Sequence, residues 1–71
     1  MNVFILTKEY KNSDHVIEII NVYTHYNSAF DAVYEQHNME FSQVNEATWV
    51  TGWTAGKDPV RYLLAEWQVQ S

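Results

Sequence analysis

The chain has 71 residues, of which 46% are hydrophobic and 18% charged, and its formal net charge is −5. A chain of this length forms one domain and buries only about 60% of the surface of its unfolded state, so its core is small. Because it contains no cysteine, disulfides and thiolate zinc sites are excluded. Only Lys8, Lys11, Lys57 and Arg61 are cationic, so direct binding to the phosphates of nucleic acid is not expected.

Membrane and export signals are not expected either. The longest apolar run, residues 3–6, is far too short to span a membrane. The N-terminus lacks the basic residues that open a signal peptide. We therefore expect a cytoplasmic protein without membrane association.

Two strands are predicted in the first third of the chain. Residues 3–10 and 15–24 are rich in β-branched and aromatic side chains, which is typical of strands. The polar residues 11–14 between them predict a turn, and so short a connection favours an antiparallel hairpin. Strict alternation would place Ile17, Ile19 and Tyr23 on one face of the second strand, opposite Val16, Ile20 and Val22.

A helix is predicted over residues 29–37, with Ser28 as its N-cap and Asp31 in its first turn. Asn38 is expected to end it in the left-handed conformation. Its apolar stripe is formed by Ala29, Phe30, Val33, Tyr34 and His37.

Two further strands are predicted after the helix. The first covers residues 44–53 and places Trp49, Thr51 and Trp53 on one face. Residues 55–59, which contain a Gly and a Pro, predict a turn. The last strand covers residues 60–69, with Tyr62 and Leu64 on one face and Leu63 on the other.

The expected fold is therefore α+β, a four-stranded antiparallel sheet in the order β-β-α-β-β with one helix packed on one face. One short helix cannot cover both faces, yet the strands are apolar on both. Large exposed apolar patches usually mark interaction sites, so we expect self-association, most simply as a homodimer. The candidate interaction surface consists of Phe4, Leu6, Tyr10, Trp49, Trp53, Asp31 and Glu35.

Catalytic and metal-binding patterns are weak in this sequence. His15, His25 and His37 have no ligand spacing, and the two glycines form no phosphate loop. Asp31 and Glu35 lie one helical turn apart, which is more typical of a solvated face than of an acid–base pair. We expect no catalytic residue, no metal and no cofactor, and we interpret the chain as a non-enzymatic protein-interaction domain.

Two other functions stay open. The excess of acids would also suit an inhibitor or DNA mimic that occupies a basic, nucleic-acid-binding protein surface. A small-ligand binder or enzyme would require a concave pocket with convergent polar groups.

Four features together resemble small uncharacterised bacterial and phage proteins with a β-β-α-β-β pattern. They are the opening VFILTKEY, the second strand ending in VYT, the helix led by Ser28, and a final strand that contains Trp67 and Glu66. The resemblance implies a fold and a phage or prophage origin, but no activity and no site residues. The strands that are apolar on both faces and the acidic surface lead us to expect a homo-oligomer that engages a host or partner protein.

Overall fold

The computed structural model describes residues 1–12 and 17–69, which form five strands and one helix. The elements in chain order are β1 (Asn2–Tyr10), β2 (Ile17–Tyr23), α1 (Tyr26–His37), β3 (Ser42–Asn45), β4 (Thr48–Val50) and β5 (Val60–Gln68). His15 and Val16 of the predicted second strand, and Ser13 and Asp14 of the predicted turn, lie outside the described residues.

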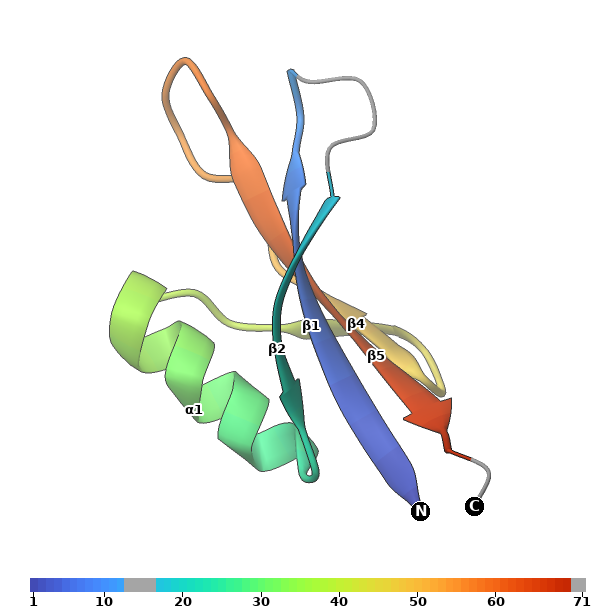
Figure 1. Ribbon diagram of the computed structural model, residues 1–71. Helices are drawn as coiled ribbons and strands as arrows, with labels where there is room; N and C mark the ends of the chain where they lie inside the picture. The colour runs from blue at the N-terminus through green and yellow to red at the C-terminus, as the bar shows by residue number, and fades with distance from the viewer. Residues whose placement is uncertain (13–16, 70–71) are drawn as a thin grey trace.

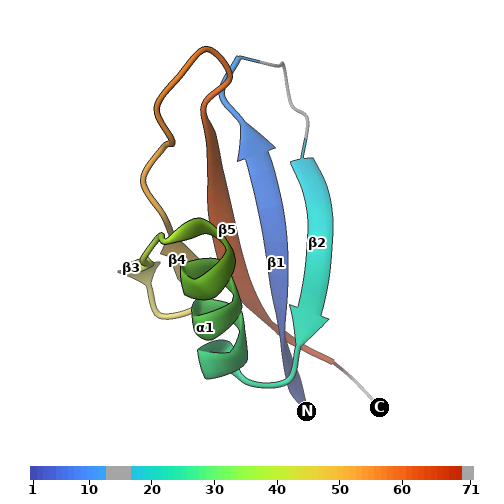
Figure 2. The same ribbon diagram turned by 90° about the vertical axis from the view of Figure 1, so that its left-hand side faces the viewer.

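All five strands belong to one antiparallel sheet with the order β2-β1-β5-β4-β3 (Figure 1). The central pair is β1 and β5, which are in register along their whole length, from Asn2 opposite Gln68 to Tyr10 opposite Val60. The helix lies on one side of this sheet, and the upper parts of the long strands extend beyond it (Figure 2). The prediction of an α+β fold with an antiparallel sheet is therefore confirmed.

The prediction of four strands is wrong, because residues 44–53 do not form a single strand. Strands β3 and β4 make a hairpin instead, in which Asn45 pairs with Thr48. The side-chain oxygen of Asn45 accepts a hydrogen bond from the backbone N–H of Ala47 at 2.9 Å, which closes the turn without Gly or Pro. The sheet thus gains a fifth strand at the edge next to β4.

The helix begins three residues earlier than predicted. Its N-cap is His25, which has extended backbone angles and makes no side-chain capping hydrogen bond, so the prediction of Ser28 as N-cap is wrong. No acidic residue lies in the first turn, which corrects the expectation for Asp31. At the other end Asn38 is left-handed, with φ of 55°, and its N–H donates to the Tyr34 carbonyl as predicted.

The core lies between the helix and the strands that it faces. Its buried members are Phe4, Leu6, Ala29, Val33, Tyr62 and Leu64. Partly buried aromatic rings, together with the exposed Tyr26, extend it toward the β3–β4 hairpin. There Tyr26 stacks on Trp49 with ring centroids 6.2 Å apart, and Phe30 stacks on Phe41 at 5.1 Å. Helix and hairpin are therefore joined by aromatic packing.

Candidate interaction surface

The core residues define which way each strand faces. Phe4 and Leu6 of β1, and Tyr62 and Leu64 of β5, pack against the helix. Since successive side chains alternate across a strand, Ile5 and its neighbours at every second position point away from the helix. We call this side of the sheet, away from the helix, the open face.

Strand β2 directs three of its aliphatic side chains to the open face, whereas Tyr23 at its end stands opposite Phe4 and packs against the core. Directly opposite residues in a sheet share a face. Ile17, Ile19 and Val22 stand opposite Glu9, Thr7 and Ile5, all of which lie on the open face. Glu18 and Asn21 stand opposite Lys8 and Leu6, on the helix side. The polarity of β2 is therefore the reverse of what the helix alone would favour.

A β-bulge produces this arrangement. Leu6 pairs with Asn21 and Thr7 pairs with Ile19, so Ile20 is an extra residue with no partner in the ladder. The bulge moves Val22 onto the same face as Ile17 and Ile19. The alternation predicted for this strand, which set Val22 and Ile20 against Ile17, Ile19 and Tyr23, is therefore wrong beyond Ile19.

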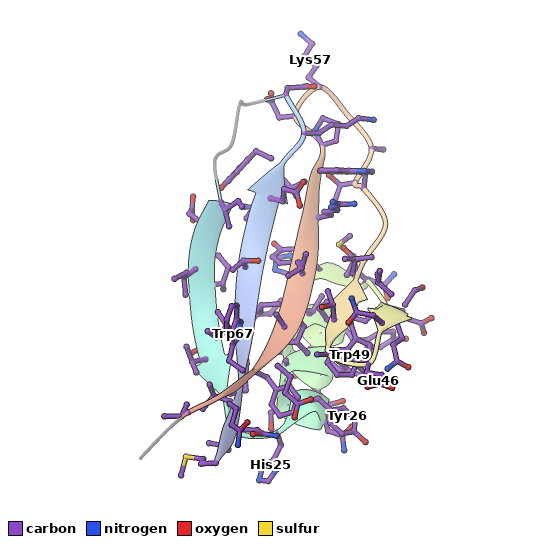
Figure 3. The ribbon with its side chains drawn as sticks, turned by 90° about the vertical axis from the view of Figure 1, so that its right-hand side faces the viewer. His25, Tyr26, Glu46, Trp49, Lys57 and Trp67 are labelled. Atoms are coloured by element: carbon purple, nitrogen blue, oxygen red, sulfur yellow. The ribbon has the colours of Figure 1, made fainter. Side chains whose placement is uncertain are left out.

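The open face carries a continuous apolar groove with a volume of about 380 Å³. Its lining residues come from β1, β2 and β5 and are Ile5, Thr7, Glu9, Ile17, Ile19, Leu63, Ala65 and Trp67. Large parts of this surface meet solvent, since Ile17 is 62% exposed, Ile19 70% and Trp67 59%. Figure 3 looks onto this face, with Trp67 lying over the strands and the helix behind them. An apolar surface of this kind is typical of a protein interaction site.

Charge is nearly absent from the open face. Among the described strand residues that point to it, only Glu9 and Arg61 are charged, and they pair with each other. The Arg61 guanidinium also lies over the ring of Trp53, at 4.5 Å from its centroid. At the end of the apolar groove, the charge of Glu9 is therefore neutralised by Arg61.

The helix side is acidic. Glu18 and Glu66 lie on strand positions that face the helix, and Asp31, Glu35 and Glu40 lie on or directly after the helix. Of the described cations, Lys8 is at a helix-facing strand position, while Lys11 and Lys57 lie in the turns at the far end of the sheet. The two sides of the sheet thus differ in charge.

The predicted site residues do not form one surface. Phe4 and Leu6 are 8% and 2% exposed in the core beneath the helix, so their assignment to an interaction surface is wrong for the single chain. Trp49 packs there too, with its ring 6.2 Å from that of Phe4. Trp53 lies apart from Trp49, with its ring near the cations of Lys11 and Arg61.

The polar candidates lie on the helix side. The hydroxyl of Tyr10 donates to Glu18 at 2.8 Å, on the face that the helix shares. Asp31 and Glu35 are both exposed on the helix. Asp31 lines a groove of about 310 Å³ together with Phe30, Tyr34, Met39, Glu40 and Phe41, whereas Glu35 does not.

The residues that sequence reasoning missed are those of β2 and β5 on the open face. Ile17, Ile19, Leu63 and Trp67 were recognised as apolar strand residues but not as the exposed set. The signal in the sequence is the pair of charged and polar residues Glu18 and Asn21 between the apolar residues of β2. Read together with a helix that covers one face, that pattern indicates an apolar open face.

Within residues 1–12 and 17–69, no group of three or more His, Asp or Glu side chains could hold a metal ion. No helix in the described part of the chain is long and apolar enough to cross a membrane.

Comparisons with protein-family models, with curated proteins and with solved structures found no match for this chain. The geometry and chemistry of the two sides of the sheet are therefore the basis on which a function can be proposed.

Proposed function

We propose that this chain is a non-enzymatic protein-interaction domain and that the open face is its binding surface. The observation that carries the proposal is the reversed polarity of β2, which directs Ile17, Ile19 and Val22 to solvent and Glu18 and Asn21 to the helix side. Exposed isoleucines on a strand carry a cost, because burying such a side chain is worth about 1.5–3 kcal/mol. A partner that covers the face recovers that free energy.

Site-specific photo-crosslinking in cells tests the proposal. A photoreactive phenylalanine analogue in place of Ile19 samples the open face, and the same analogue in place of the exposed Tyr34 samples the helix. We expect discrete protein adducts from position 19 that position 34 does not give. Equal adduct patterns from the two positions, or none from position 19, would contradict the proposed function.

A second candidate function is capture of a basic protein surface by the helix side. It is favoured by the five acids there, Glu18, Asp31, Glu35, Glu40 and Glu66. Such binding would weaken steeply as salt rises, because attraction between exposed charges is screened beyond about 8 Å at physiological ionic strength. Partner binding that does not weaken as salt rises would contradict this function. So would binding that is unchanged in a variant with both Asp31→Asn and Glu35→Gln.

The phage origin that the resemblance implies, the host target and the cytoplasmic location remain predictions. If these predictions are correct, a bacterial cytoplasm is the setting in which the crosslinking should be done.

A further inference from the structure

We infer that the occupant of the open face is a second copy of this chain, bound face to face as a two-fold dimer. The inference rests on the proposed function, since it names the partner of the same surface. In this arrangement two sheets pack about 10 Å apart with their helices on the outside. The sheet edges, the distribution of charge and the size of the face all favour this arrangement.

The sheet edges argue against a partner that extends the sheet. Both edge strands contain a bulge, at Ile20 in β2 and at Val44 in β3. On β2 the N–H of Val22 is already bonded to the side-chain oxygen of Asn21 at 2.8 Å. Bulges and occupied backbone donors block strand addition. Association through the open face is thus favoured over addition of a strand at either edge.

The distribution of charge favours a second copy over a charged partner. The ion pair between Glu9 and Arg61 leaves the open face without net charge, so it offers nothing to attract a basic or an acidic protein. A second copy brings an equally neutral, apolar surface. Contact through the open faces also places the two acidic helix layers on opposite sides of the dimer, which keeps repulsion between them low.

The size of the face fits a small interface. Strands β1 and β5 have nine residues each and β2 has seven. At about 3.3 Å per residue and about 4.8 Å between strands, these three strands cover roughly 400 Å² before side-chain relief is added. Typical stable interfaces use about 800 Å² of accessible surface from each partner. We therefore expect a concentration-dependent dimer with a dissociation constant on the order of micromolar.

Sedimentation of the purified full chain tests this directly, from low micromolar to several hundred micromolar concentration. The mass should rise from 8.4 kDa toward twice that value. Ile19→Lys should stay monomeric at every concentration, because it places a charge among the exposed apolar side chains of the contact. Tyr34→Lys, an equally drastic change on the exposed side of the helix, should dimerise like the wild type. Circular dichroism checks that both variants fold, and Trp67→Glu replaces Ile19→Lys if that variant does not.

The outcomes separate the dimer from the proposed function. A wild-type chain that stays monomeric, or a dimer that Ile19→Lys and Trp67→Glu leave intact, overturns the second copy as occupant. If position 19 then crosslinks to a different protein, the open face remains the binding surface and only the dimer is wrong. If position 19 gives no specific adduct either, both proposals fail.

Discussion

Arg61 of β5 and Glu9 of β1 form a bidentate ion pair. The arginine Nε donates to Oε2 of the glutamate at 3.1 Å, and Nη2 donates to Oε1 at 3.2 Å. The pair is partly buried, with about 30% of each side chain exposed. The Trp53 ring lies against the same guanidinium. Arg61 thus neutralises the charge of Glu9 at the end of the open face. It also holds the loop that follows β4 against β5 through its contact with Trp53.

Replacing this arginine by lysine should weaken the fold although the charge is kept. Arg61→Lys loses the fork geometry and the planar contact with Trp53. We expect a loss of about 0.5–1 kcal/mol in the free energy of unfolding, measured by urea denaturation at low protein concentration. Lys57→Ala, which removes a cation from the nearby turn, should change it by less than about 0.5 kcal/mol. Equal losses in the two variants would contradict a specific role for the pair.

Leu64 and Leu63 are neighbours on β5 that face opposite sides of the sheet. Leu64 is fully buried under the helix, whereas Leu63 lines the groove of the open face. Leu64→Ala should lower the free energy of unfolding by about 2–5 kcal/mol at any protein concentration, because it leaves a cavity in the core. Such a loss is a large part of the stability of a small domain.

Leu63→Ala is the matched control and should act differently. In a single chain the side chain is only half-buried, so the loss at low concentration should be clearly smaller than for Leu64→Ala. At high concentration, where the dimer forms, the difference between Leu63→Ala and wild type should grow, because folding and association are linked. Thermal melting at two protein concentrations measures both effects. A loss for Leu63→Ala that does not depend on concentration would argue against a contact at Leu63.

Thr51 is the buried polar residue that continues the β4–β5 ladder beyond β4. Its hydroxyl accepts the N–H of Tyr62 at 2.9 Å and donates to the Gly52 carbonyl at 3.0 Å, while its own N–H donates to the Tyr62 carbonyl. Thr51→Val keeps the shape but leaves the Tyr62 N–H without an acceptor. We expect a loss of about 1–3 kcal/mol in the free energy of unfolding.

Thr51→Ser separates the hydrogen bond from the packing. It keeps the hydroxyl and loses one methyl group, so it should cost about 1 kcal/mol at most. Denaturant unfolding of the two variants under the same conditions provides the comparison. If serine proved as harmful as valine, the hydroxyl would not be the reason that Thr51 is buried.

Local sequence patterns predicted the regular strands well. The separation of Leu63 from Leu64 that was predicted for the last strand is confirmed in β5, and the same alternation in β1 places Phe4 and Leu6 on one face and Ile5 on the other. The pairing of these two strands is regular from end to end, so successive side chains alternate between the two faces of the sheet along the whole length. The left-handed Asn38 was also predictable, because Asn tolerates that conformation at the end of a helix.

The interaction surface could not be predicted in the same way. The bulge at Ile20 depends on how β2 pairs with β1, and counting by two along β2 does not reveal it. Which apolar face the helix would cover also depends on packing across the chain, where Tyr26 meets Phe4 and Trp49. The sequence therefore predicted one uncovered apolar face without determining which one, and its candidates Phe4 and Leu6 are residues that the helix buries.

The start of the helix offers a last test, because packing and capping signals disagree there. The sequence favoured Ser28 as N-cap, whereas the helix begins at Tyr26 after His25, with Tyr26 stacked on Trp49. His25 already has extended backbone angles but makes no capping bond, so His25→Ser should supply one and raise the free energy of unfolding by about 0.5–1 kcal/mol.

Ser28→Ala is the control that decides between the two helix starts. Within the helix, alanine is a better helix former than serine, so this change should raise the stability slightly or leave it unaltered. If Ser28 were the N-cap, the same change would instead cost about 1 kcal/mol. Urea denaturation of both variants shows whether each change raises or lowers the free energy of unfolding. Stabilisation by His25→Ser without loss in Ser28→Ala would show that the N-cap is residue 25 and not residue 28, although Ser28 carries the stronger capping signal in the sequence.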